Sequence, residues 1–145
     1  MNKAFKTLNM ITAAGTLLNS VFYLAAPSFS IFLLGRTTNP IGLMNTRMAG
    51  ACGMGLLVIS WASRNVVERK FQQIVAGGNM IMFIFLVMVE LHGTLSGAMN
   101  WVGWLFLVAD SSLGMGYTIF LILSYRSRKV IPPQVGETSK RLIQK

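Results

Sequence analysis

Four stretches of this chain are apolar over the length that a bilayer requires. They cover about 8–26, 47–63, 74–91 and 101–125. A helix rises about 1.5 Å per residue and the hydrocarbon layer is about 30 Å thick, so about 20 such residues form a transmembrane helix. Charged residues make up 12% of the chain, against about 25% in a typical soluble domain. The sequence therefore predicts one all-α domain over 1–125, a bundle of four transmembrane helices.

A further apolar segment follows the first predicted span. Pro27 ends that span because proline cannot continue a helix without losing a hydrogen bond. The segment from Ser28 to Gly35 is too short to cross a bilayer, so we expect a short interfacial helix at the level of the headgroups. The turn 36–40, which contains Pro40, ends it.

The basic residues predict how the spans are threaded. Eleven of the 13 lie before the first span, between the second and third, or in the tail 126–145, and only Arg36 and Arg47 lie on the other side. By the positive-inside rule, we expect both termini in the cytoplasm. We expect the membrane to be the inner or plasma membrane of a cell. The net charge of +9 then predicts attraction to anionic lipid at the cytoplasmic face, not nucleic-acid binding.

Four ionisable residues lie within the apolar stretches or at their ends, and all fall in the outer half of the predicted bundle: Arg47, Glu90, His92 and Asp110. Such charges are costly in lipid and are normally paired, neutralised or turned toward a cavity. We expect Arg47 to pair with Asp110 or Glu90, with Asn19 and Asn79 as further interior polar groups. This cluster has three interpretations: an ion pair that fixes helix register, a pocket for a small ligand, lipid headgroup or quinone, and a site of proton-coupled movement.

Small residues predict where helices approach each other closely, because helices in lipid associate through tight packing. The second span contains two small-xxx-small pairs, Ala49 with Gly53 and Ala51 with Gly55. On the fourth span, Gly103 and Gly114 have the same predicted role.

Cofactor and enzyme signals are sparse. Met44, Met48 and Cys52 form a stripe of soft ligands that would suit copper(I). His92, the only histidine, could supply one axial ligand to haem or chlorophyll but not two. The sequence contains no HExxH motif, phosphate-binding glycine loop or nucleophile elbow. We therefore predict no metal, no catalytic residues and no resident cofactor, with quinone or lipid as alternatives.

A set of spaced residues resembles the small four-helix membrane proteins of the DoxX-like group. It comprises Pro27, the segment ending in Leu33-Leu34-Gly35, Arg47 with Gly50, Gly53 and Gly55, and then Trp61 and Arg64. The resemblance covers about residues 20–125. It implies a compact four-helix bundle with an interfacial segment after the first helix, and a quinone-linked or redox accessory role.

Two classes of function follow. The first is a non-enzymatic accessory or scaffold subunit, or a ligand-binding bundle, that associates with itself or with a larger membrane complex. The second is a small proton-coupled transporter of the efflux type, suggested by Glu90 and Asp110. A lipid- or quinone-binding protein acting from the outer half is a third alternative.

Overall fold

The computed structural model describes residues 2–127, which form five helices and no strand. They are α1 (Asn2–Ala25), α2 (Pro27–Leu33), α3 (Pro40–Ser63), α4 (Arg69–Leu95) and α5 (Trp101–Arg126). All except α2 are long and apolar enough to cross a membrane. The predicted all-α class is confirmed, and the composition of the four long helices indicates a membrane protein. Most of the predicted tail, from 128 to 145, lies outside the described residues.

The helices extend beyond the apolar ranges that predicted them. Three begin earlier than those ranges, at Asn2, Pro40 and Arg69. Apolar ranges mark only the part of a helix that suits hydrocarbon, whereas backbone hydrogen bonding continues through the polar ends. The start of α3 shows what sets the true boundary: Asn39 accepts a hydrogen bond from the Gly42 amide at 2.9 Å and Pro40 occupies the first helical turn.

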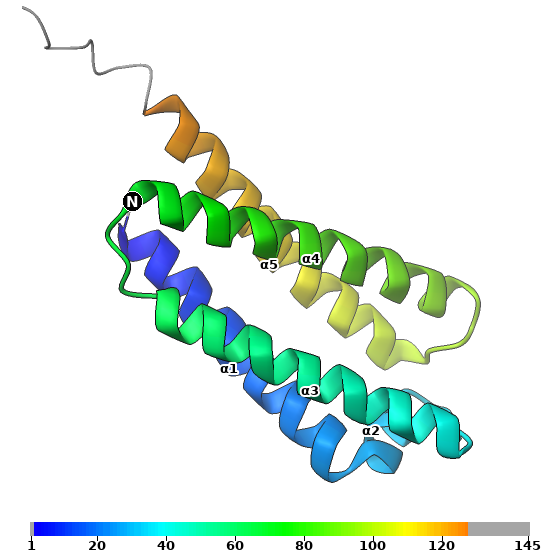
Figure 1. Cartoon of the computed structure of the whole chain (residues 1–145). Helices are drawn as coiled ribbons and strands as arrows, with labels where there is room; N and C mark the ends of the chain where they lie inside the picture. The colour runs from blue at the N-terminus through cyan, green and yellow to red at the C-terminus, as the bar shows by residue number, and fades with distance from the viewer. Residues whose placement is uncertain (1, 128–145) are drawn as a thin grey trace, which may run out of the picture.

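The four long helices form two antiparallel pairs, α1 with α3 and α4 with α5 (Figure 1). Contact between the pairs is much smaller and runs mainly between α1 and α5. The starts of α1 and α4 and the ends of α3 and α5 share one end of the bundle. We call it the basic end, because it carries, among the described residues, Lys3, Lys6, Arg64, Arg69, Lys70 and Arg126.

The apolar core lies where α4 and α5 meet the first half of α1. Phe5 and Phe120 pack with their ring centroids 5.3 Å apart, and Phe83 stacks on Tyr117 at 6.0 Å. These four side chains are buried, whereas most large apolar side chains on the other faces are exposed. A bundle that leaves its apolar surface uncovered and buries only a small core is suited to lipid rather than water.

A buried polar network crosses this core and joins the two helix pairs. The Thr12 hydroxyl lies 2.9 Å from the Tyr117 hydroxyl, which also donates to Asn9 Oδ1 at 3.4 Å. The Asn79 side-chain amide approaches the same Asn9 oxygen at 3.5 Å. Asn9, Thr12 and Tyr117 are fully buried, so they satisfy each other's hydrogen-bonding groups in place of water.

Replacing Tyr117 with Phe tests how much this network stabilises the bundle. The change removes one hydroxyl and leaves Thr12 with a buried group to satisfy, so we expect the free energy of unfolding to fall by about 1–3 kcal/mol. Unfolding in mixed micelles by increasing SDS measures this value. Tyr125→Phe is the matched control, because Tyr125 is 54% exposed. An equal change in both variants would contradict the assigned role.

At the end opposite the basic end, loops join the two pairs. Arg36, in the turn after α2, donates through Nε to the Ala98 carbonyl at 3.1 Å and through Nη2 to the Gly97 carbonyl. The Asn100 side-chain amide donates to the Leu33 carbonyl at 3.0 Å. Arg36 therefore holds the α4–α5 loop against the α2–α3 turn.

The α1–α3 contact depends on two glycines of α3. A Cβ atom at Gly50 would lie 2.9 Å from Cβ of Tyr23 and 3.1 Å from the Ser20 carbonyl oxygen, and Gly53 faces the Ser20 side chain. The other small residues predicted to pack on this helix do not do so, since Ala49 and Ala51 are exposed and Gly55 has open space beside it. On α5, Gly103 packs against Thr94 and Met99, and Gly114 packs against Phe83.

Candidate functional site

Two carboxyl groups meet across the α4–α5 interface. Glu90 lies on α4 with 9% of its surface exposed, and Asp110 on α5 is half-buried. Their side chains lie within reach of a mutual hydrogen bond. The second Glu90 oxygen, Oε2, is buried and has no hydrogen-bond partner. The structure thus joins the two acidic residues that the sequence placed within apolar stretches.

Tyr23 of α1, in the other helix pair, is within electrostatic range of the acidic pair. It is half-buried and lies close enough to both carboxyl groups to interact with their charges. Tyr23 also lines a cavity of about 270 Å³ between α1, α2 and α3, whose other lining residues include Ser30, Asn45 and Thr46. The surface of this cavity is mostly apolar, and neither Glu90 nor Asp110 lines it.

Arg47 does not join the acidic pair. Its side chain is exposed on α3, and among residues 2–127 no hydrogen bond or ion pair connects it to Glu90 or Asp110. The reason is the pairing of the helices: α3 packs on α1, whereas both acids belong to the α4–α5 pair, and α3 has little contact with α4. The expected ion pair is absent from the described structure.

Within residues 2–127, no hydrogen bond joins the side chain of any remaining predicted polar residue to the two acids. His92 is exposed in the last turn of α4, Asn19 is half-buried on α1, and Asn79 belongs to the polar network around Tyr117. Asn79 lies 11 positions before Glu90 on α4, roughly 16 Å at helical rise. The sequence predicted one outer cluster, whereas the structure contains two separate groups of polar residues. One is the Glu90–Asp110–Tyr23 site, and the other is the buried network nearer the basic end.

The soft-ligand stripe faces outward. Met44 and Met48 are 64% and 58% exposed, and Cys52 is exposed on the same helix. Within residues 2–127, no three His, Cys, Asp or Glu side chains are grouped as metal ligands would be. The stripe is therefore on the exposed surface of α3 and is not part of the buried polar network.

Sequence reasoning missed the polar face of α1. Polar residues recur along this helix at three- or four-residue spacing, at Asn9, Thr12, Thr16, Ser20 and Tyr23. Residues at that spacing share one helix face. Asn9, Thr12 and Ser20 are buried, and Thr16 and Tyr23 are half-buried. The spacing alone would have predicted an interior polar face that includes Tyr23.

The acidic pair has the chemistry of a proton or cation site. A hydrogen bond between two carboxyl groups needs a proton on one of them, since an ionised carboxylate can only accept. Two ionised carboxylates this close in a membrane would repel each other and would lack water to solvate them. A bound cation removes both problems. The pair can therefore exist as a shared-proton form or as a cation complex.

Comparisons with protein-family models, with curated proteins and with solved structures gave no match.

Proposed function

We propose that the chain is a small multi-pass membrane carrier that exchanges a proton for a cationic ligand at Glu90 and Asp110. The observation that carries this proposal is the proximity of two carboxyl groups that have no basic partner among residues 2–127. Ionisable residues inside membrane spans are retained at an energetic cost, and they commonly mark ion or proton pathways.

The exchange balances charge in a simple way. In the proton form, one carboxyl donates a hydrogen bond to the other and the pair carries one negative charge. When a monovalent cation binds between the two carboxylates, that proton leaves to solvent, and the site again carries one negative charge. One proton is released for each monovalent cation bound, so a proton gradient can drive the cation in the opposite direction.

Tyr23 gives the site a way to distinguish its occupants. An aromatic face attracts a cation through its quadrupole, with a strength of about 0.5–2 kcal/mol. The cavity of about 270 Å³ that Tyr23 lines provides space for part of a small organic cation. We therefore favour an organic cation with an apolar portion over a bare metal ion.

The proposed threading places both termini in the cytoplasm and the acidic pair in the outer half of the bilayer. It follows from the basic end, which carries six basic residues among those described, and from the positive-inside rule. On this basis the protein is assigned to a bacterial-type inner membrane or a plasma membrane.

Uptake into vesicles tests the proposed exchange. The full chain is reconstituted into lipid vesicles with an acidic interior, and uptake of radiolabelled tetraphenylphosphonium is followed from outside. We expect uptake above that of protein-free vesicles, and collapse of the proton gradient should abolish the difference. Uptake equal to that of protein-free vesicles, or uptake that ignores the gradient, would contradict the proposal.

A second candidate, an accessory subunit of a membrane complex, is favoured by α3. This helix packs almost entirely on α1 and leaves large side chains exposed, among them Val58, Ile59 and Trp61 at 51–63%. An accessory subunit would present such a face to a larger protein. Native mass measurement after gentle solubilisation separates the two candidates, because a lone monomer that still transports the probe excludes an obligatory accessory role.

A further inference from the structure

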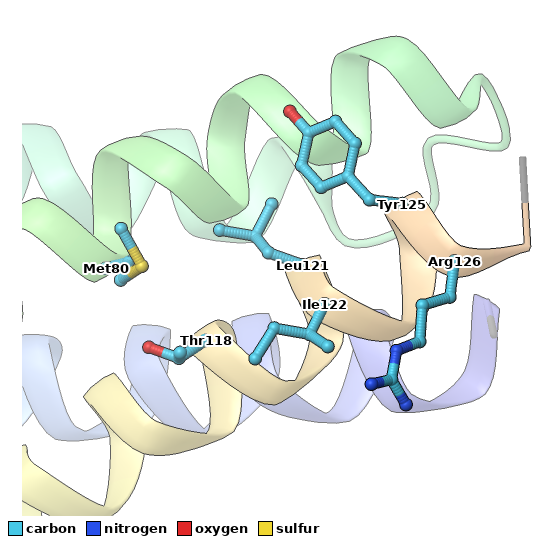
Figure 2. A pocket seen from close by; sticks show the side chains of 6 residues that line it. All are labelled: Met80, Thr118, Leu121, Ile122, Tyr125 and Arg126. Carbon is cyan, nitrogen blue, oxygen red and sulfur yellow. The ribbon is translucent and has the colours of Figure 1, made fainter.

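An apolar crevice opens between α4 and α5 near the basic end, far along both helices from the acidic pair. Its volume is about 410 Å³, and Met80, Thr118, Leu121, Ile122, Tyr125 and Arg126 line it. Figure 2 shows Met80 of α4 facing the α5 residues, with Tyr125 and Arg126 at the end of the crevice where α5 terminates. The crevice therefore has an apolar length and one charged end.

The polar groups that line the crevice are arranged to suit a lipid, with the charged group at one end. The Thr118 hydroxyl donates to the Gly114 carbonyl at 2.8 Å, so that group is already satisfied within α5. Tyr125 is 54% exposed in the last turn of α5, the level at which tyrosine commonly meets headgroups. Arg126 is exposed beside it. Apart from the charged end, nothing in the crevice needs a polar ligand.

Charge complementarity at this end selects the headgroup. No acidic residue lines the crevice, and Arg69 at the start of α4 adds positive charge to the same end of the bundle. Basic pockets between transmembrane helices recognise anionic lipid headgroups, while an acyl chain gains by filling an apolar groove. A zwitterionic headgroup would bring its own positive charge to Arg126 and lose part of this attraction.

We infer that this crevice binds one anionic phospholipid of the surrounding bilayer, with an acyl chain along Met80, Leu121 and Ile122 and the phosphate at Arg126. This inference is independent of the exchange proposed for Glu90 and Asp110. It concerns other residues, from Met80 in the middle of α4 and from the second half of α5.

Lipid retention in native mass spectrometry tests the assignment. The full chain, purified in mild detergent, is titrated with phosphatidylglycerol or with phosphatidylcholine of the same acyl chains. We expect one phosphatidylglycerol to be retained in preference to phosphatidylcholine. Equal retention of both lipids, or a statistical spread of several bound lipids, would overturn the assignment.

Two pairs of variants locate the site. Arg126→Gln should weaken phosphatidylglycerol binding about fivefold. This factor corresponds to the attraction of about 1 kcal/mol that each basic residue near the lipid surface contributes. Lys70→Gln removes the same charge at the same end but outside the crevice, and should change binding less than twofold. Equal effects of the two substitutions would indicate diffuse attraction and overturn the site.

Ile122→Trp fills the crevice, whereas Leu123→Trp places the same ring on a neighbouring residue that does not line it. Both residues are about half exposed, at 50% and 53%, so both variants should fold. We expect the first to lower retention of phosphatidylglycerol and the second to leave it unchanged. Unchanged retention in Ile122→Trp would show that no acyl chain occupies the crevice.

Discussion

Asp110→Asn should abolish proton-driven uptake of tetraphenylphosphonium while leaving the free energy of unfolding unchanged or slightly higher. The variant leaves one carboxyl group in place of two, so no second carboxylate remains to share the proton or to hold the cation from the other side, and the exchange at the Glu90–Asp110 pair stops. Stability should not fall, because the variant removes one of two carboxyl groups that have no basic partner among the described residues. Functional sites commonly show this opposition between activity and stability.

Glu90→Gln should behave in the same way, and Glu68→Gln is the control for both. Glu68 is exposed and lies immediately before α4, so the same chemical change there should alter neither uptake nor stability. SDS unfolding in mixed micelles gives the stability of each variant. A loss of about 3–5 kcal/mol in Asp110→Asn would indicate that Asp110 belongs to a structural ion pair, and would contradict a site for exchange.

Gly50→Leu should separate α1 from α3 and lower the free energy of unfolding by about 3 kcal/mol, the upper part of the range for overpacked sites. The added Cβ alone would lie 2.9 Å from Cβ of Tyr23 and 3.0 Å from Cγ of Leu24, and 3.1 Å from the backbone oxygen of Ser20. Because one of these atoms belongs to the backbone, the helices must move apart. Tyr23 would move with them, so uptake of the cation should fall as well.

Gly55→Leu makes the same change five residues further along α3, where nothing lies within 4 Å of the added Cβ. We expect unchanged or increased stability, because leucine favours a helix over glycine by up to about 1 kcal/mol. SDS unfolding of both variants gives the comparison. Equal destabilisation by the two substitutions would mean that the close contact at Gly50 does not hold the α1–α3 pair together.

The fold was predictable because the bilayer imposes a strong requirement on the sequence. Apolar length alone identified the four long helices, and the short run after Pro27 identified α2. The boundaries of the helices were harder to predict. Helices such as α3 begin at a capping residue, here Asn39, that lies outside the apolar range. The sequence also did not predict which helices pack against each other. Small residues occur on several helix faces, and on α3 only Gly50 and Gly53 lie close to α1.

The candidate site was predictable in part, for the same physical reason. Glu90 and Asp110 were conspicuous because charges are costly in lipid. Their partner was misjudged: opposite charge suggested Arg47, but helix pairing leaves that residue on another face, and Tyr23 of α1 is instead within electrostatic range of the two acids. Residue type indicates which groups need a partner, whereas the arrangement of the helices determines which partner they meet.

Counting the protons released on ligand binding tests the exchange most directly. The purified chain in weakly buffered detergent solution is titrated with tetraphenylphosphonium, and released protons are measured with a pH-indicating dye. The account predicts about one proton per bound cation for the unmodified chain and for Glu68→Gln, and none for Asp110→Asn or Glu90→Gln. Cation binding that releases no proton from the unmodified chain, or equal release from all four proteins, would contradict it.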